Sequence, residues 1–302
     1  MLLWKNELNQ LDPVTTECGA FNVANVEDVA SWLSAIELGR SGLTLCDVDS
    51  DMTQFLWTAS ANYIIATSPR SGSYLLCEAL MASGIAGRPH EYAGPADDAT
   101  WKHFHRFPTH AAYFFQFADL CRSANGIVGV KFMVPQLLEF VTDAQRYLRS
   151  HETPIEAIKT LLGTCRIIRL CRRDRFRQAA SWVRAQQTGE WSKNPSALRQ
   201  SICHYDINAL RDAVIHIARQ EQYWERLIVD ANLPVHRIDY EDMDENYSSA
   251  VTRTLSFLGF SGAMPIRAPA MVKQADAVTD EWLERLAVDL GDYSRMKPPP
   301  DM

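Results

Sequence analysis

The chain has 302 residues, 47% of them hydrophobic, which is enough to bury a core of ordinary density in one large domain or in one domain with an appendage. The net charge of -7 argues against a general nucleic-acid or anionic-membrane surface, although local basic clusters still suit a small anion. No stretch approaches the roughly 18 apolar residues of a membrane span, and charged residues near the N-terminus argue against a signal peptide.

The cysteines and histidines predict neither a disulfide framework nor a metal site. The seven cysteines are scattered and odd in number, and no two of them form a Cys-x-x-Cys pair, which suits reduced thiols. His103, His105 and His110 lie in an aromatic-rich stretch without a cysteine or carboxylate at metal-ligand spacing. We therefore expect a cytoplasmic protein without a metal.

Residues 1–58 are predicted to form an N-terminal appendage, followed by the main domain over residues 59–302. Within the appendage, residues 27–38 have the apolar spacing of a helix that ends at Gly39. We expect this helix to pack on the core, although it would also suit an oligomer surface or a lid.

The main domain begins with the stretch 63–76, YIIATSPRSGSYLL, which predicts a strand, a small polar loop and a helix. Ser68, Arg70, Ser71, Gly72 and Ser73 bring hydroxyls, a guanidinium and accessible amides to the start of the helix, where an anion binds favourably. The loop lacks the Walker A pattern, and an arginine stands where the lysine would be expected. The alternative is that the serine hydroxyls only cap the helix.

Further apolar strands and amphipathic helices alternate along the main domain. The strands are predicted over residues 126–132, 165–171 and 235–240, and the helices over 74–83, 113–123, 135–147, 176–187, 206–231 and 248–258. This order predicts an α/β fold of P-loop-like architecture, with a mainly parallel sheet and helices on both faces. Ligands bind such sheets at the carboxyl ends of the strands, where the first loop, Lys131 and Arg172 would meet.

A second phosphate site is indicated where the strand 165–171 ends. Arg173 offers a planar fork for a phosphate, and Ser181, eight residues later, adds a hydroxyl from the following helix. The alternative is a solvated basic start of a helix.

Four segments, in this order, carry a family resemblance: SPRSGSYLLCEALMASGIAGRPHEY, GVKFMVPQL, RRDRFRQAASWVRAQQTGEW and VKQADAVTDEWLERL. Together with VHRIDYEDM, they resemble the sulfotransferases that use 3′-phosphoadenosine 5′-phosphosulfate (PAPS). The details are similar to the trehalose 2-sulfotransferase branch, which bacterial carbohydrate and lipopolysaccharide sulfotransferases also resemble. The resemblance covers residues 63–285 and also suggests a homodimer.

The resemblance implies two groups of donor-binding residues. The 5′-phosphosulfate would be held by Arg70, Ser71, Gly72, Ser73 and Tyr74, and Arg70 would also stabilise the charge of the leaving phosphate. The 3′-phosphate would be held by Arg173, Ser181, Lys273 and Gln274. Tyr74 departs from the threonine usual in the family, which puts its side-chain contact in doubt.

Glu91 occupies the position of the family's base, and a partly desolvated carboxylate there would have a raised pKa. His90 is the alternative base, and an ion pair with Arg88 is the alternative role of Glu91. The resemblance assigns the acceptor side to His90, Lys131, Trp182, Gln187 and Trp191, although the two tryptophans would equally fit the core. Tyr240 and Glu241 are predicted to be architectural, with the glutamate bonded to nearby backbone or to an arginine.

The resulting prediction is sulfuryl transfer from PAPS to a hydroxyl of a carbohydrate or glycolipid, by in-line displacement with a carboxylate base. An ATP-dependent small-molecule kinase would also use a strand, loop and helix, but it would need a lysine in the loop and a carboxylate for magnesium. A non-catalytic nucleotide-binding protein is the third alternative. Trehalose, another sugar, a lipid-linked glycan and a non-sugar alcohol all remain open as acceptors.

Overall fold

A computed structural model of the chain describes residues 62–91, 114, 118, 120–148, 153–163, 165–191, 203–260, 266 and 277–289. All of them belong to one compact unit. The predicted appendage over residues 1–58 lies outside the described residues, and so does most of the helix predicted over 113–123. The boundary predicted between residues 58 and 59 therefore stays a prediction.

The described strands form one four-stranded parallel sheet in the order β2-β1-β3-β4. The strands are β1 (Tyr63–Ala66), β2 (Gly129–Phe132), β3 (Arg166–Cys171) and β4 (Val235–Asp239). Because all the pairings are parallel, the carboxyl ends of the strands share one edge. The predicted α/β fold class is confirmed.

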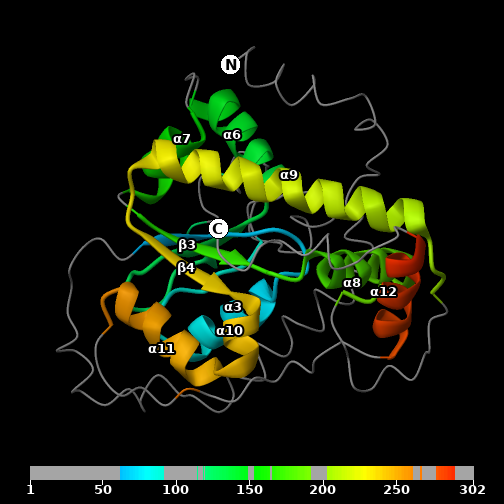
Figure 1. The fold of residues 1–302 in the computed structure, drawn as a ribbon. Helices are drawn as coiled ribbons and strands as arrows, with labels where there is room; N and C mark the ends of the chain where they lie inside the picture. The colour runs from blue at the N-terminus through cyan, green and yellow to red at the C-terminus, as the bar shows by residue number, and fades with distance from the viewer. Residues whose placement is uncertain are drawn as a thin grey trace. The chain divides into compact units, whose positions relative to one another are not determined.

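Helices cover both faces of this sheet (Figure 1). The helix α9 runs across one face together with α6 and α7, whereas α3, α10 and α11 lie on the opposite face. The helices are α3 (Ser73–Ala82), α6 (Val134–Leu148), α7 (Pro154–Leu162), α8 (Arg175–Thr188), α9 (Ile207–Ala231), α10 (Tyr240–Glu245), α11 (Tyr247–Phe257) and α12 (Ala277–Asp289).

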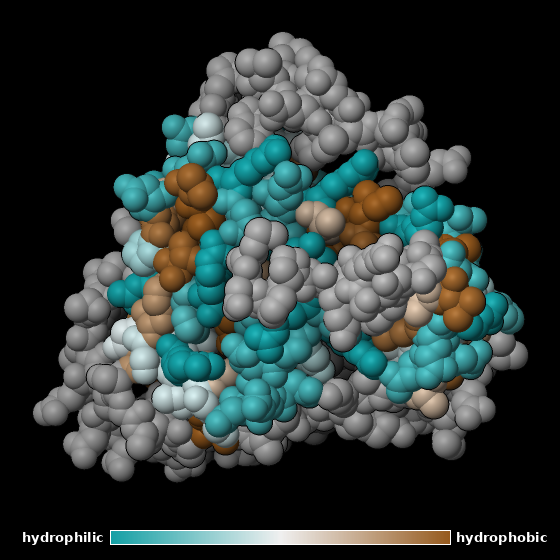
Figure 2. Space-filling view, viewed as in Figure 1, coloured by the Kyte–Doolittle hydropathy of each residue, from teal (hydrophilic) through white to brown (hydrophobic). Residues whose placement is uncertain are grey.

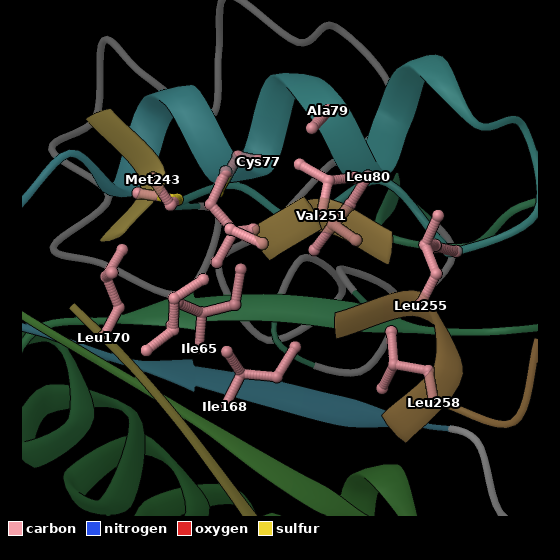
Figure 3. Close-up of a cluster of buried hydrophobic side chains, with 14 of the residues drawn as sticks. Ile65, Cys77, Ala79, Leu80, Ile168, Leu170, Met243, Val251, Leu255 and Leu258 are labelled. Atoms are coloured by element: carbon pink, nitrogen blue, oxygen red, sulfur yellow. The ribbon is translucent and has the colours of Figure 1, made fainter. Parts of the chain in front are cut away.

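Buried apolar clusters join several of the described elements, and two of them show how. In the first, Ile65 of β1 and Ile168 of β3 face Leu80 of α3 and Val251 of α11 (Figure 3). In the second, α8, α9 and α12 pack against one another through residues such as Trp182 and Trp282. Because the central strand β1 is covered on both faces, its four residues are all buried, which explains the continuous apolar run in the sequence.

Apolar residues on the viewed face form separate patches among hydrophilic ones (Figure 2). Among the described residues, the large hydrophobic side chains that stay exposed are those of Ile215, Val229 and Val288. No helix in the described part of the chain has the length and apolar character needed to cross a membrane.

Candidate functional site

The loop between β1 and α3 is shaped by two residues in the left-handed backbone region, Arg70 (φ 61°) and Gly72 (φ 82°). Gly72 is the N-cap of α3 and, having no side chain, gives the helix no side-chain cap. The Ser71 hydroxyl hydrogen-bonds that of Thr67 (2.5 Å), and the Ser73 hydroxyl accepts from Lys131 (3.4 Å). Backbone amides at the start of a helix that lack a side-chain cap suit an anion.

Gly72 also allows Tyr240 to approach the loop. A Cβ on Gly72 would lie 2.4 Å from Cδ2 of Tyr240, and the positive φ disfavours any larger residue. We expect Gly72→Ala to lower the free energy of unfolding by about 1–3 kcal/mol, because it combines backbone strain with a clash. Urea unfolding measures the loss, with Gly84→Ala as control, since Gly84 has a similar φ of 72° but nothing within 4 Å. Equal losses in the two variants would show that the approach of Tyr240 is unimportant.

Side chains of helices α8 and α9 anchor the start of the loop. Ser68 donates to Oε1 of Glu221 (2.6 Å) and accepts from Nε2 of Gln178 (2.9 Å). The indole of Trp224 donates to the carbonyl of Thr67 (2.8 Å). The start of the loop is therefore fixed by three buried side chains, Glu221, Gln178 and Trp224.

A buried charge network continues from Glu221. Arg169 of β3 is 0% exposed and forms ion pairs with Glu221 and with Glu225 (3.1 Å). Glu225 also pairs with Arg237 of β4 (2.7 Å), so the network links three elements behind the loop. The sequence did not reveal this charge network. Glu221 lies within the apolar stripe of its helix, where a charged residue breaks the pattern without indicating its partner.

Arg70 is held over the loop by α8 and the segment that follows it. Its Nε donates to Oγ of Ser181 (3.0 Å), and its Nη1 donates to the carbonyl of Trp191 (2.5 Å). Burial and the nearby Arg172 guanidinium lower the pKa of Arg70 to about 10. The structure thus joins a residue predicted for the 5′ end of the donor to one predicted for the 3′-phosphate.

Arg173 instead lies among carboxylates at the end of β4. Its guanidinium is exposed and pairs with Asp242 (3.0 Å) and Asp239 (3.2 Å). Glu241 accepts hydrogen bonds from the backbone amides of Arg173 (3.0 Å) and Asp174 (3.2 Å), which confirms its predicted architectural role. Within the described residues, the guanidinium of Arg173 thus pairs with carboxylates at β4, whereas the Ser181 hydroxyl accepts from Arg70.

Charged and aromatic side chains around Lys131 come together where β2 passes the loop. Lys131 is 1% exposed, forms an ion pair with Glu91, donates to Oγ of Ser73 (3.4 Å) and lies 3.6 Å from the centroid of the Tyr74 ring. Its backbone amide donates to the carbonyl of His90 (3.2 Å), which fixes the neighbouring Glu91 beside β2. The lysine therefore contacts both the start of α3 and the predicted base.

The charges of this cluster are coupled. Burial would raise the pKa of the Glu91 carboxyl, but the Lys131 ammonium holds it below its ordinary value, so the expected rise is wrong. The pairing partner is Lys131 rather than Arg88. Burial and Lys131 lower the pKa of His90 to about 4, whereas burial and Glu91 raise that of Tyr74 to about 12. Near neutral pH, the cluster therefore presents an ionised carboxylate beside two neutral rings.

The other residues predicted to face an acceptor have different surroundings. Trp182 is 3% exposed and lies in the apolar cluster of α8, α9 and α12. Its ring centroid is 5.2 Å from that of His216, and its burial agrees with the core interpretation. The exposed Gln187 donates to the carbonyl of His204 (3.0 Å) and accepts from its amide (2.8 Å). Trp191 is half-buried and packs against the same apolar cluster.

Two donor-site predictions, Lys273 and Gln274, lie outside the described residues, as do His103, His105 and His110. In the part of the chain that the structure describes, no group of three or more His, Cys, Asp or Glu side chains is arranged to hold a metal ion.

Comparison with known proteins locates relatives of this chain. A family model described as Stf0 sulphotransferase matches residues 62–289. A trehalose 2-sulfotransferase of Mycolicibacterium smegmatis is 26% identical over 260 residues, covering 75% of this chain and 94% of the relative. A trehalose 2-sulfotransferase of Mycobacterium tuberculosis is 28% identical over 250 residues, covering 74% and 93%. A crystal structure of a sulfotransferase from Alicyclobacillus acidocaldarius matches with a TM-score of 0.39 and 15% identity, covering 78% of this chain and 94% of that one.

Proposed function

Because the chain belongs to the Stf0 sulphotransferase family, we propose that it transfers a sulfuryl group from PAPS to a hydroxyl of a carbohydrate or glycolipid. The observation that carries the proposal is the position of Lys131, which contacts Ser73 at the start of α3 and Glu91 at once. An anion-binding loop and a proton acceptor thus belong to one connected cluster. The names of the two mycobacterial relatives support a carbohydrate as the acceptor.

The donor would span the loop and the ends of β3 and β4. Its 5′-phosphosulfate would be held by Arg70, Ser71, Gly72, Ser73 and the amide of Tyr74. Its 3′-phosphate would be held by Arg173, Ser181, Lys273 and Gln274. Arg173 would exchange its pairs with Asp239 and Asp242 for the phosphate, which costs little because exposed ion pairs contribute little stability.

Transfer would proceed by in-line displacement at sulfur. Glu91 accepts the proton of the acceptor hydroxyl as its oxygen forms the new bond to sulfur. The bond from sulfur to the phosphate oxygen breaks, its electron pair stays on the phosphate, and Arg70 stabilises the charge that develops there. Lys131 keeps Glu91 ionised before the reaction. His90, Gln187 and Trp191 would complete the acceptor side, whereas the buried Trp182 would support it from the core.

The alternatives predict different ligands. A small-molecule kinase would bind ATP with magnesium, and a non-catalytic protein would bind a nucleotide without turnover. The cytoplasmic location, expected from the cysteine pattern, stays a prediction. The homodimeric state, which the resemblance suggests, stays one as well.

We expect 3′-phosphoadenosine 5′-phosphate (PAP), the desulfated donor, to stabilise the folded chain. At a concentration of about 100 times its dissociation constant, the ligand should add about 2.7 kcal/mol. Thermal unfolding with PAP, compared with ATP and magnesium, tests this. A rise in melting temperature with ATP and magnesium, but none with PAP, would favour the kinase alternative and contradict the proposal.

A further inference from the structure

The ammonium of Lys131 is buried where β2, the start of α3 and the segment around Glu91 meet. Its side chain is 1% exposed and pairs with the Glu91 carboxylate, and its Nζ donates to Oγ of Ser73 (3.4 Å). Burial alone would lower the pKa of Lys131, but the Glu91 carboxylate raises it above its ordinary value. The side chain is therefore charged at neutral pH although water hardly reaches it.

The ring of Tyr74, the second residue of α3, makes a further contact with this ammonium. Nζ of Lys131 lies 3.6 Å from the centroid of the ring. This distance is well within the roughly 6 Å over which an aromatic face attracts a cation, and the attraction is strongest where the cation is desolvated. The contact with Tyr74 therefore favours one position of the ammonium, beside both Glu91 and Ser73.

Tyr74 also contacts the residue that precedes Glu91. Its ring meets the His90 ring edge-on, with the centroids 5.6 Å apart and the planes at 67°. The carbonyl of His90 in turn accepts a hydrogen bond from the backbone amide of Lys131 (3.2 Å). One aromatic ring thus touches the lysine that pairs with Glu91 and also the chain segment that carries Glu91.

We propose that Tyr74 is a positioning residue for the base: the face of its ring holds the Lys131 ammonium against Glu91 and so fixes the carboxylate beside the phosphate loop. This inference rests on the proposed function, because it takes Glu91 as the proton acceptor. It gives the ring of Tyr74 a role separate from that of its backbone amide, which faces the donor in the proposed function. The inference requires the aromatic face and not the hydroxyl.

Two substitutions separate the aromatic face from the bulk of the side chain. Tyr74→Phe keeps the face and loses only the hydroxyl, whereas Tyr74→Leu removes the face and keeps an apolar side chain. We expect kcat for sulfate transfer to be about threefold to thirtyfold higher in Tyr74→Phe than in Tyr74→Leu, which corresponds to a desolvated cation–π contact. Titration with PAP should give the two variants equal donor affinity, because both retain the backbone amide.

The NMR signal of the Lys131 methylene next to Nζ reports the contact without any turnover. In protein with ¹³C-labelled lysine, this signal is identified by its absence in Lys131→Arg. Protons held over an aromatic face resonate upfield of their ordinary position because of the ring current. We expect the upfield position in the unmodified protein and in Tyr74→Phe, and a shift toward the ordinary lysine position in Tyr74→Leu.

Equal kcat values in the two variants would overturn the inference, and so would an upfield Lys131 signal that persists in Tyr74→Leu. A loss of PAP affinity in Tyr74→Leu as large as its loss of kcat would also overturn it, because the ring would then act through the donor. An unmodified protein that shows the upfield signal but transfers no sulfate would instead overturn the proposed function, while the contact between ring and ammonium would stand.

Discussion

Replacing Glu91 with glutamine is expected to lower kcat by about 10²–10⁴-fold without weakening the binding of PAP. The amide has nearly the same size as the carboxylate but cannot accept the proton of an acceptor hydroxyl. Because the glutamine amide oxygen can still accept a hydrogen bond from Lys131, the contact of Lys131 with Ser73 in the phosphate loop should be kept. Sulfate-transfer kinetics give kcat, and titration with PAP gives the donor affinity.

The control for this prediction is His90→Asn, which changes the alternative base. Since the pKa of His90 is lowered to about 4, its ring is neutral at pH 7 and is itself a formal proton acceptor. We expect His90→Asn to retain most of the wild-type kcat. A large loss in His90→Asn together with normal turnover in Glu91→Gln would move the base to the histidine.

The pH profile gives an independent check on Glu91. Proton acceptance by Glu91 requires the ionised carboxylate, which is present above the pKa of this carboxyl and is lost as pH falls through that pKa. Because the Lys131 ammonium depresses this pKa below the ordinary 4.5, the acid limb of kcat should also lie below 4.5. An acid limb near pH 6 or 7 would contradict the ion pair as the dominant influence on Glu91.

Replacing Glu221 with glutamine is expected to lower the free energy of unfolding by about 3 kcal/mol, because it leaves the buried Arg169 with one of its two carboxylate partners. It also weakens the hydrogen bond that Ser68 donates from the loop. Urea unfolding monitored by circular dichroism measures the loss.

The matched control is Glu225→Gln in the next turn of α9. The Glu225 side chain is 44% exposed, and much of its interaction is with Arg237, which is also exposed. Exposed pairs contribute little, so this variant should lose clearly less stability than Glu221→Gln. Similar losses for the two variants would mean that burial of Glu221 does not determine the strength of the network.

The fold could be predicted from the sequence where local patterns and packing agree. The helix over residues 175–188 was expected over 176–187, since its apolar spacing and its end at Gly189 are both local signals. The helix α7 was missed although Thr153 and Glu156 form a capping box, which is a recognisable signal. The short α10 was missed because it follows β4 directly, without an intervening loop.

The site could be predicted only in part. The loop and Glu91 follow from short motifs, but the partner of Glu91 comes from a strand 40 residues away and is set by tertiary contact. The anchoring of Ser68 by Glu221 spans 153 residues and has no local signature. Whether Trp182 lies in the core or faces a substrate depended on the packing of α8 against α9 and α12, which a single helix does not specify.

The central claim is that the loop around Arg70 and the carboxylate of Glu91 form one sulfuryl-transfer site. The direct measurement is the transfer of radiolabelled sulfate from PAPS to trehalose and to a panel of other sugars and glycolipids. The wild-type protein should label a carbohydrate acceptor, and Glu91→Gln should bind PAP but leave every acceptor unlabelled. Phosphorylation of an acceptor from ATP and magnesium, with no sulfate transferred from PAPS, would contradict the claim.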